Sequence, residues 1–426
     1  MKDHLIAGID IGSSCIRLAI GQVLLTADKR PSLNIIGVAE VPSQGISKGV
    51  VSSLEDAVTA ISGCLEQAER QVGLPVSEAY VGIGGTFTNV QLAKGVIGVS
   101  RADGEIREED IQRVLESARS VVNPANYEIL HVLPKGFLVD GQSGIKDPLG
   151  MQGIRLEVEA HIVQGLSTHV RNLTKAVFRT NMDISELVYT PLAAAHVVTN
   201  SRQREVGVAV VNIGGATTSV AVYEEGELLH AVVIPLGSDH ITQDIAIVLR
   251  TSLDAAERVK REYISADATH IDKHEVLDLR EVGAEQSEVV SPRFISDIAQ
   301  ARAEEIFEKV QQELKKINRS GMLPAGVILT GGGVKLRGMA DLAKTTLRLP
   351  VSVAACVAVS TPLTEVLQDT AFTTALGLVV WGFDSERQSG GTSTRGNGAP
   401  SLATKGGAFM KKMSSPLKKI FKSFMP

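Results

Sequence analysis

Two segments of the chain combine glycine with small hydroxyl residues in a pattern that suits phosphate binding. Residues 5–20 read LIAGIDIGSSCIRLAI, and residues 206–223 read VGVAVVNIGGATTSVAVY. In each, two apolar β-branched runs flank a tight turn, which is typical of a strand, a turn and a second strand. Glycine lets a ligand approach the backbone closely, and successive N–H groups in such a turn form a concavity for anions.

The presence of two copies changes how this pattern is interpreted. One copy alone favours an ordinary β-hairpin. Two copies, roughly 200 residues apart, predict a duplicated α/β domain that holds one polyphosphate from two sides. Three consecutive glycines, at 331–333, follow another apolar run, so a ring or a phosphate could lie against this backbone as well. The glycine cluster at 82–86 has no P-loop lysine after it and is interpreted as a turn.

Length and composition bound the class of protein. At 426 residues, with 44% hydrophobic residues, the chain has room for about two to three domains with buried cores. A net charge of −5 argues against a protein that is basic overall. Cys15, Cys64 and Cys356 lack metal-ligand spacing and predict a reducing compartment. No apolar run of about 18 residues and no N-terminal signal run are present, so no membrane span is expected.

Apolar periodicity places these motifs on an alternation of strands and helices. It predicts helices over 54–72, 168–181, 253–262 and 292–317, and strands over 34–41, 79–83, 184–189, 228–234 and 326–329. Residues 86–161 differ in character. Short strands at 90–99, 127–133, 136–139 and 154–163 surround one helix at 108–121 and a loop at 141–150. This predicts an inserted α+β subdomain whose exposed strands and loops could pair with another protein.

Four motifs, in chain order, resemble the superfamily of actin, DnaK-type chaperones and sugar kinases: DIGSS, NIGGATTS, AERVK and LTGGGVKLRGM. Within that superfamily, the segments HVLPKGFLVDGQSGIKDPLGM at 131–151 and GISKGVVSSLEDAV at 45–58 resemble the bacterial cell-division family FtsA. The resemblance covers the whole chain, and the middle segment is its most specific part.

This resemblance implies an α/β, actin-like fold with two lobes, an inserted subdomain 1C and a C-terminal amphipathic helix. The implied divisions are lobe 1A (1–85 and 162–205), subdomain 1C (86–161), lobe 2A (206–236 and 322–384), subdomain 2B (237–321), a flexible linker (385–408) and a membrane-targeting helix (409–426).

The resemblance also implies an ATP–Mg²⁺ site between the lobes. The two hairpin turns would hold the phosphates, Glu257 and Lys260 would face the adenosine, and the triple glycine would back it. Asp10 would orient Mg²⁺ through water, because Mg²⁺ keeps much of its hydration shell. The nucleotide-binding residues expected in this way are Gly12, Ser13, Ser14, Cys15, Asn212, Gly214, Gly215, Ala216, Thr217, Gly237, Glu257, Lys260, Gly331, Gly332, Gly333 and Lys335.

Three departures from the superfamily pattern bear on catalysis. Asn212 stands where relatives place Asp, Cys15 stands where a Lys often reaches phosphate, and Thr190 stands where relatives place a water-orienting Glu or Gln. Phosphoryl transfer depends on positioning and on charge held around the phosphate. We therefore predict nucleotide binding with weak or negligible turnover and assign no catalytic residue.

The C-terminal segment predicts a reversible membrane anchor. Residues 387–401 are rich in Ser, Gly and Thr, and six lysines follow between 405 and 422. A helix from about Pro416 would be too short to persist in water, so a surface must complete it. An anionic membrane is the surface that best fits this basic, apolar segment. The alternatives are a groove on a partner protein or a nucleic acid, and the clustering of apolar residues on one face argues against nucleic acid. The expected membrane-facing residues are Met410, Met413, Leu417, Lys418, Lys419, Ile420, Phe421, Lys422 and Phe424.

The resemblance completes the functional prediction with partners. Subdomain 2B would bind the C-terminal peptide of the tubulin-like FtsZ, with Arg293 and Phe294 at the start of the binding helix. The chain would polymerise with itself, meet other division proteins through 1C and bind no nucleic acid. Its place would be the cytoplasmic face of the inner membrane at the division site. A PilM-type pilus-assembly protein and a sugar-kinase-like enzyme are the alternatives; the first would not need the basic tail, and the second would need a catalytic Asp.

Overall fold

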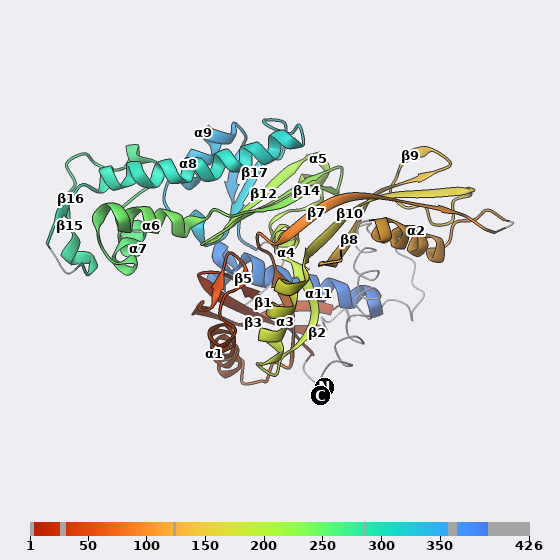
Figure 1. Cartoon of the computed structure of the whole chain (residues 1–426), viewed down its shortest axis with the longest axis horizontal. Helices are drawn as coiled ribbons and strands as arrows, with labels where there is room; N and C mark the ends of the chain where they lie inside the picture. Colours follow the sequence, from red (N-terminus) through yellow and green to blue (C-terminus); the bar gives the residue numbers. More distant parts are fainter. Residues whose placement is uncertain are drawn as a thin grey trace.

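The computed structural model describes residues 4–25, 31–101, 103–121, 125–284, 287–356 and 364–390. They form two lobes, each built around a five-stranded sheet, and a four-stranded sheet that extends to one side (Figure 1). The predicted α/β architecture, with two lobes and an inserted α+β subdomain, is confirmed.

The sheet of the first lobe has the strand order β11-β6-β1-β2-β3. Strands β1, β2 and β3 form an antiparallel meander, and β6 and β11 run parallel to β1. The strands are β1 (His4–Ile11), β2 (Cys15–Leu25), β3 (Pro31–Pro42), β6 (Glu78–Ile83) and β11 (Asp183–Tyr189). Parallel strands end at the same edge of a sheet, so the β1–β2 turn lies beside the ends of β6 and β11.

One face of this sheet is covered by α1 (Leu54–Val72) and α3 (Ser167–Phe178). The bounds of α1 follow from its caps. The Ser53 side chain accepts a hydrogen bond from the N–H of Asp56, and Gly73, at φ 74°, ends the helix in the left-handed conformation. Between them, Ile61, Cys64 and other apolar residues are buried at helical spacing. The helix predicted over 54–72 is confirmed.

The sheet of the second lobe repeats this topology. Its order is β14-β13-β12-β17-β18, with β12, β13 and β14 antiparallel and with β17 and β18 parallel to β12. The strands are β12 (Val208–Ile213), β13 (Thr218–Glu224), β14 (Glu227–Ile234), β17 (Val327–Thr330) and β18 (Val351–Val353). Each strand has a counterpart in the first sheet, which confirms the predicted duplication.

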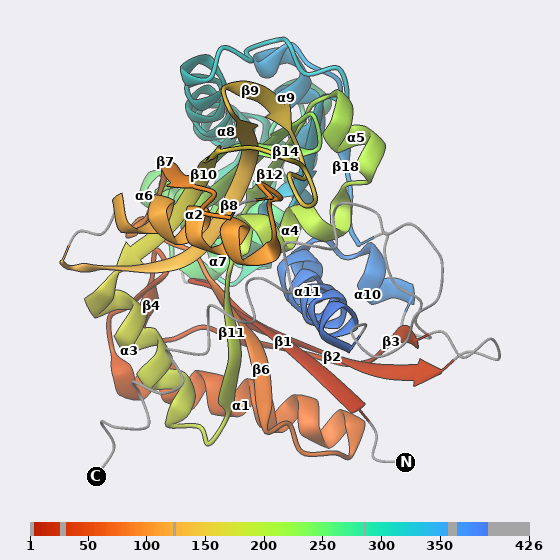
Figure 2. The same cartoon turned by 90° about the vertical axis from the view of Figure 1, so that its right-hand side faces the viewer.

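One helix of each lobe packs against the sheet of the other lobe. Helix α11 (Thr373–Gly390) follows β18 in the chain but lies on β1, β2 and β6 (Figure 2). Helix α4 (Thr190–Val198) follows β11 and contacts β12, β13 and α11. Its alanine run, at 193–195, is fully buried, and these small side chains allow close helix packing. The two helices thus form one continuous apolar core between the sheets.

Helix α11 corrects two predicted boundaries. The resemblance implies lobe 2A up to residue 384 and a linker from 385, whereas α11 packs on the first sheet and continues to Gly390. Tertiary contacts hold this end of the helix. Ser385 is buried, Asp384 is 2.8 Å from His196 Nε2, and Glu386 pairs with His4. The polar, Ser- and Gly-containing end of α11 is predicted as a linker because the local sequence does not reveal these long-range partners.

The inserted subdomain is a sheet of order β7-β10-β8-β9 covered by one helix. Its elements are β7 (Thr88–Gly98), α2 (Glu108–Val121), β8 (Tyr127–Val139), β9 (Gln142–Ile145) and β10 (Arg155–Leu166). The strands predicted over 127–133 and 136–139 are one strand, because a register shift opposite β10 absorbs Lys135. The predicted loop at 141–150 contains β9. Asp140 and Gly141, at φ 49° and 88°, form the tight turn of a hairpin between β8 and β9.

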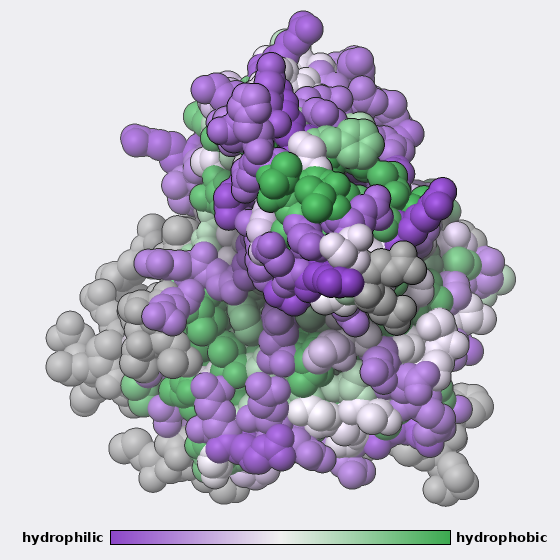
Figure 3. All heavy atoms as spheres, turned by 90° about the vertical axis from the view of Figure 1, so that its left-hand side faces the viewer, coloured by the Kyte–Doolittle hydropathy of each residue, from purple (hydrophilic) through white to green (hydrophobic). Residues whose placement is uncertain are grey.

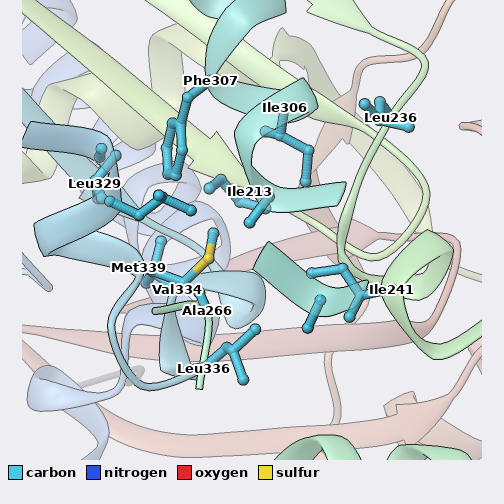
Figure 4. Packing of buried hydrophobic residues seen from close by; sticks show 14 of the residues in the cluster. Ile213, Leu236, Ile241, Ala266, Ile306, Phe307, Leu329, Val334, Leu336 and Met339 are labelled. Carbon is cyan, nitrogen blue, oxygen red and sulfur yellow. The ribbon is translucent and has the colours of Figure 1, made fainter. Parts of the chain in front are cut away.

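The second lobe carries a helical subdomain between β14 and β17. Its elements are α6 (Ser238–Leu249), α7 (Leu253–Glu262), β15 (Leu277–Asp278), β16 (Val289–Val290) and α8 (Pro292–Lys316), and α9 (Met339–Leu347) follows β17. Helix α8 lies over the second sheet. Figure 4 shows Ile306 and Phe307 of α8 in one apolar core with Ile213 and Leu329 of the sheet.

The remaining elements are short: β4 (Ile46–Ser47), β5 (Val50–Val51), α5 (Ser201–Val206), α10 (Thr364–Gln368) and the 3-10 turns η1 (Ala268–His270), η2 (Leu279–Val282), η3 (Gly332–Lys335) and η4 (Thr370–Phe372). Within the parts of the chain that the structure describes, no helix combines the length and the apolar character needed to cross a bilayer. The predicted membrane-facing residues, from Met410 to Phe424, lie outside the described residues.

Candidate functional site

A cleft of about 830 Å³, including its solvent-open part, lies between the two lobes. It is formed where the parallel strands of both sheets end, which is the usual position of a ligand site in an open α/β sheet. Both predicted hairpin turns and the triple glycine contribute to it. The predicted residues that line it are Asp10, Gly12, Ser13, Ser14, Cys15, Asn212, Gly214, Gly215, Ala216, Thr217, Gly331 and Gly332.

The first hairpin presents a tight backbone turn to the cleft. A Cβ at Gly12 would lie 2.6 Å from the carbonyl oxygen of Cys15, so only glycine fits the turn. Ser13 Oγ accepts a hydrogen bond from the N–H of Gly49 at 3.2 Å, which fixes the turn against the β4–β5 segment. Burial raises the pKa of the Cys15 thiol, so this residue is neutral in the cleft.

The second hairpin is held by the start of α6. The N–H of Ser238 donates to the carbonyl oxygen of Gly214, and the N–H of Asp239 donates to that of Gly215, both at 2.9 Å. A Cβ at Gly237 would lie 2.3 Å from the Gly215 oxygen, so glycine is required for this contact. Gly237, predicted to bind nucleotide, therefore supports the hairpin from behind and does not line the cleft.

The triple glycine divides into two roles. Gly331 has φ 92°, and a Cβ on it would lie 2.2 Å from Asn212 Oδ1. Because glycine has no side chain, the end of strand β17 can pack closely against the end of strand β12. Gly331 and Gly332 line the cleft. Gly333 instead packs on Ile213, and Lys335 pairs with Asp369 at 2.7 Å. Neither Gly333 nor Lys335 lines the cleft.

Asp10, the predicted metal residue, lines the cleft at the end of β1. Burial raises the pKa of this carboxyl to about 6, although the nearby Arg17 acts in the opposite direction. A bound divalent cation would favour the ionised form. Among the described residues, no group of three or more His, Cys, Asp or Glu side chains is arranged to hold a metal.

Arg17 also lines the cleft, although it is not among the predicted nucleotide-binding residues. Its Nε donates to Glu40 Oε2 at 2.5 Å, and its guanidinium lies 5.8 Å from the ring centre of Phe372. Arg17 thus brings a positive charge to the cleft near Cys15, although it is paired with Glu40. The available signal was its position on β2, two residues beyond Cys15 and hence on the same face of the strand.

Glu257 and Lys260 do not line the cleft between the lobes. Lys260 is buried, and its Nζ lies 2.6 Å from Glu257 Oε2 and 2.7 Å from Thr242 Oγ1. Burial acts to raise the pKa of Glu257, but Lys260, with help from Thr242 and Arg261, outweighs it and holds this pKa below its usual range. The pair thus ties α7 to α6, and its expected contact with adenosine stays a prediction.

Thr190 lines the cleft as the first residue of α4. A Cβ at Gly84 would lie 2.0 Å from Thr190 Oγ1, so glycine is needed for the strand end to approach this hydroxyl. Gly82 and Gly84 also line the cleft, although the sequence pattern favours a simple turn for them. The glycine cluster indicates a possible ligand contact in the sequence, but only the fold shows that β6 ends beside β1 and so places it in the cleft.

The predicted partner residues lie far from this cleft, at the start of α8. Arg293 Nη1 donates to the carbonyl oxygen of Ile271 at 3.0 Å, and the Phe294 side chain is 55% exposed. Val276 and Val289 are also exposed in this subdomain, at 69% and 64%. Figure 3 shows apolar side chains gathered within the mostly polar face at this end of the molecule.

Comparison with known proteins identifies relatives along the whole body of the chain. The profile of Cell division protein FtsA matches residues 209–377, and that of the SHS2 domain inserted in FTSA matches residues 85–164. The chain is 34% identical to cell division protein FtsA of Pseudomonas aeruginosa over 93% of each chain. It is 37% identical to that of Bacillus subtilis over 91% of this chain and 86% of the relative.

Solved structures with this fold include a chain of the PilM-PilN type IV pilus biogenesis complex, with a TM-score of 0.64 and 19% identity over 88% of this chain and 98% of that one. MreB5 of Spiroplasma citri bound to AMPPNP has a TM-score of 0.53 and 12% identity over 91% and 98%. At these identities the likeness shows the actin-like fold alone. Given the two matching profiles and relatives 34% and 37% identical over most of its length, the chain belongs to the FtsA family of cell division proteins.

Proposed function

We propose that this protein binds ATP–Mg²⁺ in the cleft between its lobes. The observation that carries the proposal is the convergence of both glycine hairpins and of Gly331 and Gly332 on one cleft, with Asp10 and Arg17 beside them. The hairpins offer backbone N–H groups to phosphates, Arg17 offers a fixed positive charge, and Asp10 orients the hydrated metal. The AMPPNP bound to the MreB5 relative in fold supports the same assignment.

We further propose that turnover is slow. Asn212 and Thr190 both line the cleft where a carboxylate and a longer amide or acid would assist hydrolysis. Arg17 is already paired with Glu40 and so replaces the lysine missing at Cys15 only in part; the expected deficit therefore rests mainly on the metal side and on the attacking water. Bound nucleotide then acts mainly as a structural ligand that favours one arrangement of the lobes.

The full proposed role is a polymerising adaptor at the cytoplasmic face of the inner membrane at the division site. The C-terminal segment would bind anionic lipid, where each lysine contributes about 1 kcal/mol. One such segment binds reversibly, and several on a polymer bind firmly through effective concentration. The exposed Phe294 and the neighbouring Arg293 would receive the C-terminal peptide of FtsZ. Subdomain 1C, with boundaries near 86 and 161, would meet other division proteins.

The experiment that tests this role is co-sedimentation with anionic liposomes. The full chain is compared with a chain ending at Gly390, the last residue of α11, with and without ATP–Mg²⁺. The proposal expects pelleting that needs the C-terminal segment and anionic lipid and that ATP strengthens. Pelleting that ignores both the segment and the lipid charge would overturn the anchoring role, and addition of FtsZ then tests recruitment by the anchored protein.

A further inference from the structure

One hydrogen bond joins the two sides of the cleft at its phosphate end. Ser14 Oγ donates to Asp239 Oδ2 at 2.6 Å. Ser14 lies in the β1–β2 turn of the first lobe, whereas Asp239 lies in the first turn of α6 in the second lobe. The two residues are 225 positions apart in the chain, so this contact depends on the relative position of the lobes.

Both side chains lie against the backbone of the second hairpin. A Cβ at Gly215 would be 1.7 Å from Ser14 Oγ and 2.5 Å from Asp239 Oδ2. They therefore occupy space next to the backbone of Gly215; Gly215 and Ser14 line the cleft, and Asp239 contacts both of them from α6. The N–H of Asp239 donates to the Gly215 carbonyl oxygen at 2.9 Å, which keeps the carboxylate at this position. The positive end of α6 also favours a negative charge in its first turn.

We propose that Asp239 is a built-in competitor of the nucleotide's phosphate and that the Ser14–Asp239 bond is a clasp between the lobes. This inference rests on the nucleotide site proposed above. A serine hydroxyl carries one proton, so Ser14 donates either to Asp239 or to a phosphate oxygen. The Asp239 carboxylate also repels a polyphosphate that approaches the same hairpin. Nucleotide binding thus opens the clasp, which couples the site to movement between the lobes.

The first test measures ATP affinity at equilibrium in wild type and in Asp239→Asn, each with Mg²⁺ and with EDTA. The variant keeps the size of the side chain and removes its charge. Asp254→Asn is the matched control, because Asp254 is an exposed acid in the first turn of the next helix, α7. We expect Asp239→Asn to bind ATP about fivefold more tightly, or better, under both conditions, and the control to match wild type.

Unchanged or weaker binding in Asp239→Asn would overturn the competitor role. Weakening confined to Mg²⁺ would do so as well, because it would make Asp239 a ligand of the metal. If wild type itself binds no ATP, the proposed nucleotide site fails, and that result is distinct from failure of the clasp in a chain that does bind.

The second test needs no nucleotide. Amide hydrogen exchange of residues 12–15 is compared in wild type and in Asp239→Ala, with circular dichroism to confirm that the variant folds. The clasp predicts several-fold faster exchange in this turn, with strands β12 and β13 unaffected. Ser14→Ala removes the donor instead of the acceptor at an exposed position, and it should give the same acceleration. Unchanged exchange in both variants would overturn the clasp.

Discussion

Asn212, in β12, donates its side-chain amide to Thr374 Oγ1 in α11 at 3.0 Å. Both residues line the cleft, and the bond joins the second sheet to a helix that lies on the first. The Asn212 amide therefore has a structural partner at the position where the superfamily pattern places an acidic residue.

Asn212→Asp should therefore strengthen Mg²⁺-dependent ATP binding and lower the free energy of unfolding. The change adds a carboxylate to the cleft, and we expect the ratio of ATP affinities with Mg²⁺ and with EDTA to rise about threefold to tenfold. Loss of the amide donor should lower the free energy of unfolding by about 1 kcal/mol. Isothermal calorimetry and urea denaturation measure the two effects. Asn89→Asp, at an exposed position of β7, is the control; an equal affinity ratio in both variants would contradict the assignment.

Gly331→Ala should abolish tight nucleotide binding. Its Cβ would lie 2.2 Å from Asn212 Oδ1, and its φ of 92° is unfavourable for alanine, so the β17 end must move away from the cleft. We expect ATP affinity to fall at least about tenfold, as measured by fluorescence of a nucleotide analogue. Gly98→Ala is the matched control, since no atom lies within 4 Å of its Cβ. Wild-type affinity in a well-folded Gly331→Ala chain would show that this turn is not part of the site.

Much of this cleft follows from local sequence, and the rest depends on the fold. Glycine, hydroxyl and β-branched residues in a row predict both hairpins, since each is determined by neighbours in the chain. Arg17 and Asp239 carry no such signal. Arg17 reaches the cleft through strand alternation, whereas Asp239 bonds to Ser14, a cleft residue 225 positions away in the chain. The path of α11 back to the first sheet is likewise set by tertiary packing, which also overrides the polar composition of its end.

Replacing Lys260 tests whether the Lys260–Glu257 pair stabilises the fold or is kept for contact with a ligand. Lys260 is buried and bonded to Glu257 and Thr242, so Lys260→Met removes the buried partner of Glu257 and leaves it only Arg261 and Thr242. We expect the free energy of unfolding to fall by about 1 to 2 kcal/mol, since Glu257 keeps these two partners. Lys309→Met, at an exposed position of α8, should change it by less than about 0.5 kcal/mol. Equal stability of the two variants in chemical denaturation would argue that Lys260 is held for ligand contact instead.

His131 should make stability depend on pH. Burial lowers the pKa of this histidine to about 4, and its Nε2 accepts a hydrogen bond from the N–H of Tyr189 at 2.9 Å. The unfolded chain takes up a proton near pH 6.5 and the folded chain only near pH 4. The free energy of unfolding therefore falls as pH drops from about 6.5 to 4, by roughly 3 kcal/mol from this residue, and is level below.

The variant His131→Gln keeps an acceptor for the Tyr189 N–H and removes the titration. Denaturant unfolding between pH 7 and 4 should show a shallower fall of stability in this variant than in wild type. His274→Gln, which replaces an exposed histidine, should keep the wild-type profile. The same slope in all three chains would mean that His131 does not contribute to the acid sensitivity.

The most direct measurement is a structure of the full chain crystallised with AMPPNP and Mg²⁺. We predict nucleotide between the lobes, with its phosphates against Gly12, Gly214 and Gly215 and with the metal and its waters next to Asp10. Nucleotide bound elsewhere on the chain, or a cleft that stays empty at saturating AMPPNP, would contradict the assignment of this cleft as the nucleotide site.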